Sequence, residues 1–304
     1  MKLRVGYLIS GFFTGFILLA SFFWSLPDGK LHVVFCDVGQ GDAVYVRFPD
    51  GRDMVIDGGP NEAVLQCLGR HMPFWDRHIN IVAMSHPQKD HMQGLVSIFG
   101  RFSVDYFIRS DVDNIIDGYK QLMQVIKDKK IPIRYVQQYD RITIGPTTLS
   151  LVWPSSEQVS KGKVGTSLAS DVGITRDTSV VLGAALGELN DYSLVFSIRY
   201  GSFDVLFPGD ADMHVEDQYI GTKLADDTVE LLKVPHHGSR TGMTEGFVQW
   251  LKPKLAVISV GKNSYGHPSK EAVDMLQKYG SRVLRTDQKG DIEVVSDGTS
   301  WRVY

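Results

Sequence analysis

Residues 85–91 read Ser85-His86-Pro87-Gln88-Lys89-Asp90-His91, and they directly follow an apolar run at residues 79–84. An apolar run of this length predicts a buried strand. A loop at the end of a strand lets several side chains converge on one point, and this loop offers His86, Asp90 and His91. Neutral imidazole and carboxylate groups are ligands of zinc, manganese and iron(II) sites. The stretch therefore predicts a metal-binding loop after a buried strand.

Two later stretches have the same form, in which an apolar run is followed by potential metal ligands. Phe207-Pro208-Gly209-Asp210 provides one acid, and Val234-Pro235-His236-His237-Gly238-Ser239 provides two histidines. The sequence leaves open which of His236 and His237 is a ligand, because neighbouring side chains of an extended segment point in different directions. Three such clusters at strand ends indicate one shared metal site rather than scattered polar groups on the surface.

Short apolar runs alternate with helical patterns along most of the chain, which predicts an α/β architecture. Residues 154–190 interrupt this alternation and are rich in Ser, Gly, Lys and Thr, so we expect a long loop or insertion there. Mixed elements in two successive halves fit a layered sandwich with sheets inside and helices outside. Strands are expected at residues 31–36, 43–48, 53–56, 79–84, 104–108, 133–136, 141–144, 147–152, 192–199, 203–207, 229–233, 256–260, 282–285 and 292–295. Helices are expected at residues 61–70, 92–99, 117–129, 212–220, 245–250 and 269–279.

The first 26 residues differ from the rest of the chain. Lys2 and Arg4 precede an uncharged run at residues 5–26 that is rich in Phe, Leu, Ile and Gly. About 20 apolar residues suffice to cross a bilayer as a helix, and this run ends without a small-residue cleavage site. These features favour an uncleaved anchor at residues 1–28 over a cleaved signal peptide or a buried helix. The two basic residues would place the N-terminus inside the cell, and the domain at residues 29–304 outside the cytoplasm at the cell membrane.

Charge and cysteine content narrow the function less than the ligand clusters do. The 35 acidic residues outnumber the 32 Lys and Arg, so the chain as a whole has no electrostatic attraction to nucleic acid, although a local basic groove is compatible with these numbers. Cys36 and Cys67 form no CxxC motif. Cys36 lies in an apolar run, where a small buried hydrophobic residue is typical. Spacing alone does not decide whether the two form a disulfide in an oxidising compartment.

The ligand clusters resemble the signature of the metallo-β-lactamase fold superfamily, which is His-x-His-x-Asp-His followed by a lone acid and further histidines. The chain more closely resembles the extracytoplasmic hydrolase domain of ComEC-type competence proteins, which take up DNA. The resemblance covers roughly residues 31–296 with the motifs in the family's order. A full competence protein also has a multi-helix membrane channel, whereas one span is predicted here. The matching motifs are Asp37-Val38-Gly39-Gln40-Gly41-Asp42-Ala43, Ile56-Asp57-Gly58-Gly59, Asn190-Asp191-Tyr192-Ser193-Leu194-Val195 with Gly209-Asp210, Lys233-Val234-Pro235-His236-His237-Gly238-Ser239, Gly266-His267-Pro268-Ser269, and Arg285-Thr286-Asp287-x-x-Gly290.

The resemblance implies an αββα four-layer sandwich and a divalent metal centre of Zn²⁺ or Mn²⁺, with one or two ions. It implies that Asp57 orients the metal loop through hydrogen bonds. It implies that His86 belongs to a second metal bridged by Asp210. The ligands that it implies for the first metal are Asp90, His91 and Asp210, with His237 or His236 in addition.

Position 88 departs from the family pattern. Gln88 stands where the superfamily has His and the subfamily usually has Asp. A neutral amide is a poor ligand for a transition metal. We therefore expect a mononuclear centre, or an asymmetric pair in which one site is weak.

The ligand set implies hydrolysis by hydroxide that the metal generates at neutral pH. Asp42 and His267 are candidates to position the substrate or to protonate the leaving group, although turn formation would explain Asp42 and helix entry would explain His267. Asn190 and Ser193 would line the site, or would be ordinary strand-entry residues.

The predicted function is a membrane-anchored phosphodiesterase or nuclease, with membrane lipid and DNA or another phosphodiester as partners. One alternative is a metallo-hydrolase of a small ester, lactam or phosphodiester. Another alternative is an anchored binding module that has lost catalysis. The presence of Gln88 in the metal-binding loop leaves this alternative open.

Overall fold

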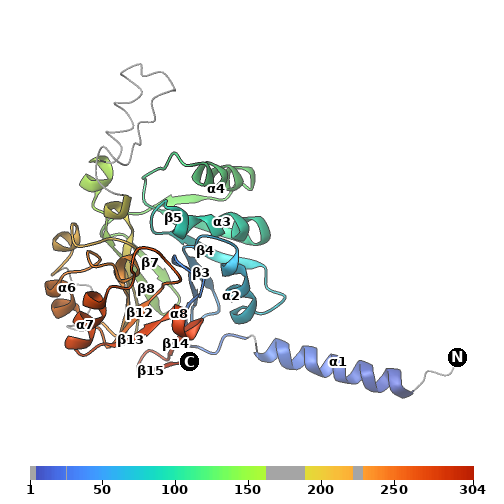
Figure 1. Cartoon of the computed structure of the whole chain (residues 1–304). Coiled ribbons are helices and arrows are strands. Elements are labelled where there is room, and N and C mark those ends of the chain that lie inside the picture. The colour runs from blue at the N-terminus through green and yellow to red at the C-terminus, as the bar shows by residue number, and fades with distance from the viewer. Residues whose placement is uncertain (1–4, 25, 162–188, 222–228) are drawn as a thin grey trace.

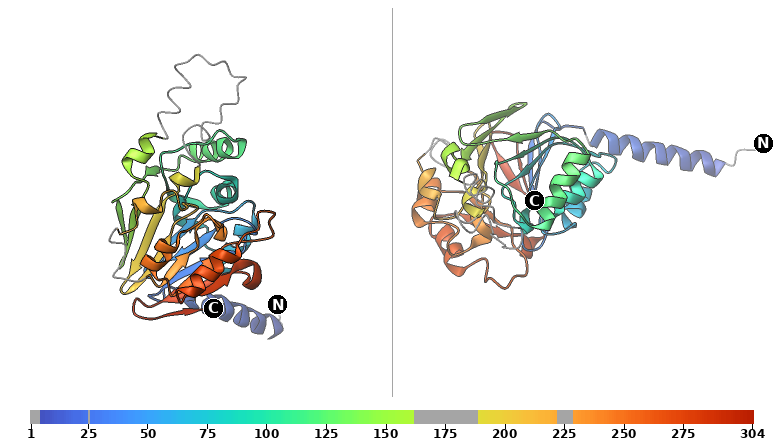
Figure 2. Two further views of the ribbon diagram at one scale, coloured as in Figure 1. Left: turned by 60° about the vertical axis from the view of Figure 1, so that its left-hand side comes forward. Right: turned by 90° about the horizontal axis from the view of Figure 1, so that it is seen from above.

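The computed structural model describes residues 5–24, 26–161, 189–221 and 229–304. Two β-sheets face each other in this part of the chain, and helices cover their outer faces (Figure 1). This arrangement confirms the predicted α/β class, with sheets inside and helices outside. Figure 2 shows the two sheets from other directions, with α2, α3 and α4 on one side and α6 and α7 on the other.

The first sheet has eight strands in the order β15-β14-β1-β2-β3-β4-β5-β6. β1, β2 and β3 form an antiparallel meander, and β3 to β6 are parallel, so β1, β3, β4 and β5 all run in one direction. Their C-terminal ends therefore lie at one edge. The strands are β1 (Leu31–Phe35), β2 (Val44–Arg47), β3 (Asp53–Ile56), β4 (His78–Met84), β5 (Ser103–Arg109), β6 (Ile133–Tyr135), β14 (Ile292–Ser296) and β15 (Trp301–Val303). The helices on the outer face are α2 (Ala63–His71), α3 (Lys89–Arg101) and α4 (Asp117–Asp128).

The second sheet has seven strands in the order β13-β12-β11-β10-β9-β8-β7, of which β10 to β13 are parallel. An apolar cluster joins its outer face to α6 (Glu245–Leu251) and α7 (Lys270–Lys278). The strands are β7 (Arg141–Ile144), β8 (Thr147–Trp153), β9 (Val195–Tyr200), β10 (Phe203–Phe207), β11 (Leu231–Lys233), β12 (Leu255–Ile258) and β13 (Arg282–Arg285).

The alternation of side chains along β1 shows how the sequence fills both sides of a sheet. Val33 and Phe35 face the second sheet, where the Phe35 ring stacks on the Phe207 ring with centroids 6.3 Å apart. Val34 points the other way, into the cluster under α2 and α3. Because both faces of the strand are covered, the strand is apolar throughout rather than alternating with polar residues.

Some expected elements differ from those in the structure. Only the 3-10 turn η2 (Glu216–Gln218) lies within the helix expected at residues 212–220. Asp212 accepts the backbone N–H of His214, and the N–H of Met213 bonds to the distant Thr241 carbonyl, so these residues follow tertiary partners rather than a helix. Helix α8 (Thr286–Lys289) and strand β15 were not expected.

Helix α1 (Val5–Trp24) occupies the expected anchor and extends away from the sheets (Figure 1). No helix among the described residues is both long enough and apolar enough to cross a membrane, so the expected single span finds no support. Most of the expected loop at residues 154–190 lies outside the described residues, which omit 162–188.

Cys36 and Cys67 form a disulfide, with their Cα atoms 5.7 Å apart. It joins the residue after β1 to the middle of α2. Cys36 is buried in the core, as expected, and the disulfide that the spacing left open is present.

Candidate metal centre

The loops after β4, β10 and β11 meet at one edge of the sandwich. Asp90, His91, Asp210 and His237 each offer a ligand atom there, and these four atoms all lie within 4.8 Å of one another. The Nε2 atoms of His91 and His237 lie 3.2 and 3.4 Å from Oδ2 of Asp210. His237 Nε2 is also 3.5 Å from Oδ2 of Asp90. The three sequence clusters thus converge on one point, as the strand-end argument expects.

Close backbone contact fixes the position of α3, which carries Asp90 and His91. The N–H of Gly58 donates to the His91 carbonyl over 2.6 Å, and the N–H of Gly94 donates to the Gly59 carbonyl over 3.0 Å. A Cβ atom at Gly94 would lie only 2.0 Å from the carbonyl oxygen of Gly58. A glycine is required at this contact, and the close approach sets the distance of both ligands from the centre.

The imidazole groups have the hydrogen-bonding pattern of metal ligands. Among the described residues, the buried Nε2 atoms of His86, His91 and His237 have no hydrogen-bond partner. Their Nδ1 atoms do have partners: Ser85 Oγ at 3.0 Å for His86, Asp57 Oδ2 at 2.9 Å for His91, and the Ser259 carbonyl at 2.9 Å for His237. A proton on Nδ1 leaves the Nε2 lone pair available, as in histidines that bind metals. The residues therefore fit a divalent cation.

The electrostatics of the centre point the same way. Burial alone would raise the pKa of Asp210, but His237, His91 and Lys233 hold that pKa well below its usual range. Burial disfavours a charge on His91, yet the Asp210 and Asp57 carboxylates raise its pKa well above the ordinary value. The carboxylates thus give the buried centre a strongly negative potential, which attracts a cation.

Asp57 lies behind His91 and is not one of the four clustered ligands. Its carboxylate accepts the backbone N–H of Ser85 at 2.7 Å and the Ser85 hydroxyl at 2.6 Å, in addition to His91 Nδ1. The side chain is 1 % exposed. Asp57 is therefore placed to fix the ring orientation and tautomer of His91.

His86 is fully buried beside His91, with ring centroids 4.1 Å apart, but it is not one of the four clustered residues. Burial and the charge of His91 lower the pKa of His86 to about 3. Near it, the Gln88 amide donates to Oδ1 of Asn190 over 2.8 Å. The position that departs from the family pattern is thus engaged with a second amide.

The two adjacent histidines play different parts in the geometry. Both have positive φ angles, 47° for His236 and 52° for His237, and this conformation turns only His237 into the cluster. His236 instead packs against His267, with ring centroids 5.6 Å apart. His267 is partly exposed, and within the described residues its Nδ1 atom has no hydrogen-bond partner.

Asp42 lies beneath the ligands, where it is 3 % exposed. One of its oxygens forms an ion pair with Lys233, and the other lies 3.4 Å from His237 Nδ1. Lys233 also contacts Asp210 Oδ1 at 3.3 Å and the Gly209 carbonyl at 2.9 Å. Sequence reasoning missed Lys233, although a lysine that ends an apolar strand just before a ligand pair is a usable signal.

The facing sheets, the helices outside them and the His/Asp cluster at the strand ends define a protein of the metallo-β-lactamase fold. The expected resemblance to proteins of this fold and to competence proteins is confirmed by comparison with known proteins. ComE operon protein 3 of Bacillus subtilis is 24% identical over 298 residues, which cover 91% of this chain and 34% of that protein. Competence protein ComA of Neisseria gonorrhoeae is 30% identical over 105 residues, which cover 34% of this chain and 15% of that protein. The chain thus spans at most about a third of the length of these relatives.

Solved structures are similar at the level of the fold. CmlA, a diiron β-hydroxylase from Streptomyces venezuelae, has a TM-score of 0.50 at 13% identity, covering 91% of this chain and 54% of that one. The metallo-β-lactamase fold protein YhfI from Bacillus subtilis has a TM-score of 0.49 at 13% identity, covering 86% of this chain and 99% of that one. No family model matches the chain.

Proposed function

We propose that this protein is a metal-dependent hydrolase that cleaves phosphodiester bonds, with DNA as its substrate. The observation that carries the proposal is the convergence of Asp90, His91, Asp210 and His237 on one point. The resemblance to competence proteins supports DNA as the substrate. A divalent cation held by these residues would act as a Lewis acid and would lower the pKa of bound water to about 7.

The residues around the cluster would hold the ligands in place. Asp57 fixes the tautomer of His91, and the Ser259 carbonyl fixes that of His237. Lys233 contacts Oδ1 of Asp210, which leaves Oδ2 directed at the two histidines. His267 packs against the His236 ring next to the ligand pair, and we infer that it helps to position the substrate there.

The centre is proposed to bind one ion tightly, either Zn²⁺ or Mn²⁺. The neutral side chain of Gln88 supports this, because an amide is a poor ligand for a transition metal and this amide donates to Asn190 Oδ1 instead. Elemental analysis of the purified protein is then expected to find about one equivalent of metal per chain. Two tightly held equivalents would overturn this part of the proposal.

The domain is proposed to work outside the cytoplasm, held at the membrane by α1. The disulfide supports an oxidising compartment, since disulfides persist there and are rare in the cytosol. The uncharged run at residues 5–26 and the exposed Phe12, Phe13 and Phe16 support contact with lipid. Membrane fractionation of cells tests the tether, and protease added to intact cells tests the side of the domain. Recovery in the soluble fraction, or protection from the protease, would contradict it.

A nuclease assay on single- and double-stranded DNA with Mn²⁺ or Zn²⁺ tests the activity. Cleavage that is lost in Asp90→Ala is the expected result. No cleavage with any metal, together with turnover of a small ester, lactam or phosphodiester, would favour the second candidate. The excess of acidic residues is the observation in favour of a small substrate, because binding duplex DNA relies on rows of Lys and Arg. DNA binding without cleavage, unaffected by Asp90→Ala, would indicate a binding module.

A further inference from the structure

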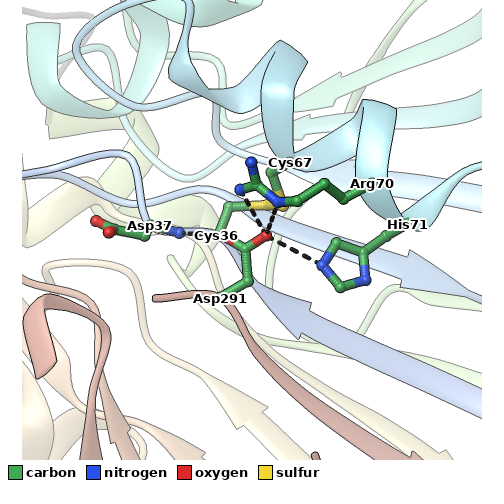
Figure 3. Close-up of a disulfide and its surroundings, with 6 residues drawn as sticks. All are labelled: Cys36, Asp37, Cys67, Arg70, His71 and Asp291. Atoms are coloured by element: carbon green, nitrogen blue, oxygen red, sulfur yellow. Dashed lines mark hydrogen bonds and ion pairs between the residues drawn. A yellow bond between two sulfur atoms is a disulfide. The ribbon is translucent and has the colours of Figure 1, made fainter. Parts of the chain in front are cut away.

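A second group of potential metal ligands surrounds the disulfide, and none of its members belongs to the centre described above. Cys67, His71 and Asp291 each offer one ligand atom, and these three atoms lie within 4.8 Å of one another. Cys36 is bonded to Cys67 through its sulfur, so the Cys36 sulfur also lies next to this group. Figure 3 shows the four side chains together, with the His71 ring directed at the Asp291 carboxylate. The distance from His71 Nε2 to Asp291 Oδ2 is 3.0 Å.

We propose that this group is a redox-controlled metal site, which binds one Zn²⁺ when the disulfide is reduced. The ligands would be the thiolates of Cys36 and Cys67, the Nε2 atom of His71 and the carboxylate of Asp291. Two sulfurs, one nitrogen and one oxygen complete the four-coordinate shell that zinc takes in structural sites. Both cysteines are almost fully buried, which suits a closed site.

The charges around the group balance when zinc is bound. Two thiolates and the Asp291 carboxylate carry three negative charges, and Zn²⁺ with the Arg70 guanidinium carries three positive charges. Arg70 donates to Asp291 through Nε at 2.8 Å and contacts it through Nη2 at 2.7 Å. Charge on the buried cysteine sulfurs needs such compensation, and the half-exposed Arg70 supplies one positive charge at the edge of the site. Arg70 is therefore part of what makes the site suitable for zinc.

The Asp291 carboxylate is already held in the orientation that a ligand needs. Its Oδ1 accepts the backbone N–H of Asp37 at 2.9 Å, while Oδ2 faces His71 and Arg70. Burial alone would raise the pKa of Asp291, but His71, the Asp37 N–H and Arg70 lower it to about 2.

The change from disulfide to metal site needs a thiol reductant and free zinc. Two molecules of a small thiol reduce the Cys36–Cys67 bond and become one disulfide, so two electrons and two protons pass to the cysteines. Zinc then displaces both protons into water as it binds the thiolates. The disulfide and the metal therefore exclude each other. Either one ties the end of β1 to α2, and zinc would add Asp291, which directly precedes β14.

Cobalt(II) distinguishes this site from the first centre, because only this site contains sulfur. The full-length protein is reduced with a phosphine, desalted without oxygen and titrated with Co²⁺, then with Zn²⁺. We expect a thiolate-to-cobalt charge-transfer band that rises to one equivalent and disappears when zinc is added. The oxidised protein should show no such band. A reduced protein that remains folded by circular dichroism, yet shows no such band, would overturn the proposal.

Three variants complete the test. Cys67→Ser should reduce the band strongly, because one of the two thiolates is lost, and His71→Gln should weaken Co²⁺ binding by more than the roughly tenfold that loss of an outer-shell partner costs. Asp90→Ala, which alters the first centre, should leave the band unchanged even where it abolishes nuclease activity. Unchanged affinity in folded His71→Gln would refute the role of His71. Loss of the band in Asp90→Ala would place the cobalt elsewhere and refute the site.

Discussion

The side-chain amide of Gln88 donates a hydrogen bond to Oδ1 of Asn190 over 2.8 Å. The two residues are 102 positions apart, and they meet beside His86 at the edge of the four-ligand cluster. A neutral amide is a poor ligand for a transition metal, and the Asn190 oxygen already accepts this hydrogen bond. This pair accounts for the expected preference of the centre for a single ion.

Gln88→Asp replaces the neutral amide with the carboxylate that the resemblance led us to expect at this position. A carboxylate adds a negative charge and a good oxygen ligand next to His86, so the metal content should rise from about one toward two equivalents per chain. Elemental analysis after dialysis measures this. Gln277→Asp, an exposed position on α7, is the matched control and should leave the content unchanged. A Gln88→Asp protein that still holds one equivalent would contradict the explanation.

The adjacent histidines can be separated by a matched pair of variants, His236→Asn and His237→Asn. Both residues have positive φ angles, and Asn tolerates this conformation better than most residues, so the backbone cost is similar. His237→Asn should lose the metal, whereas His236→Asn should retain it. Isothermal titration of the metal-free proteins with Mn²⁺ measures both. Equal affinities in the two variants would show that His237 is not a ligand.

Asp57→Asn should weaken metal binding about 10- to 100-fold without unfolding the protein. The amide can present an N–H to His91 Nδ1, which favours the tautomer with its proton on Nε2. Competition with a chromophoric chelator measures the affinity. Asp53→Asn is a suitable control, since Asp53 is also buried on this part of the chain but bonds to Tyr45 instead. An affinity loss of the same size in both variants would point to a general structural effect.

Gly94→Ala should destabilise the protein by roughly 1–3 kcal/mol, because the added methyl group meets the Gly58 carbonyl. Gly100→Ala lies on the same helix with open space around its Cβ position, and should stabilise the fold by up to about 1 kcal/mol. Urea denaturation measures both. Similar stability in the two variants would mean that α3 does not depend on the close approach at Gly94.

Glu216 should make stability depend on pH. Burial, with a further contribution from Asp212, raises the pKa of Glu216 from 4.5 to about 7. The folded state then holds the proton more tightly than the unfolded state, so stability falls as pH rises from about 4.5 to 7 and this contribution is flat above that range. Glu216→Gln should reduce this pH-dependent change in the free energy of unfolding by up to about 3 kcal/mol. Urea unfolding at pH 5 and pH 8 measures it, with Glu271→Gln, an exposed residue, as the control. A slope that persists in Glu216→Gln would assign it to another group.

The elements that the sequence predicted well are those whose ends are marked by residues next to them in the chain. The bounds expected for the strands at 53–56, 203–207 and 282–285 agree with the structure, because turn residues or changes of polarity mark both ends. Residues 212–220 misled the prediction, since the Thr241 carbonyl that holds Met213 is distant in sequence.

The same limit applies to the candidate site. Ligand types at strand ends are visible in the sequence, so the convergence of the three clusters could be expected. The contact that Asp42 makes could not be predicted, because its partner Lys233 lies 191 positions further along the chain. The choice between His236 and His237 could not be predicted either. It depends on two positive φ angles that no residue type there requires.

The parallel course of β1, β3 and β4 also determines which way the metal centre faces. The ligand loops leave the C-terminal ends of strands, whereas α1 joins the N-terminal end of β1 through a few residues. A strand of seven residues such as β4 spans about 23 Å, so roughly that distance separates the two ends of the sheet. If α1 is held at a surface, the metal centre would lie away from that surface and face the surrounding solution. A long polymer could then reach the centre from the far side without passing between the domain and the surface.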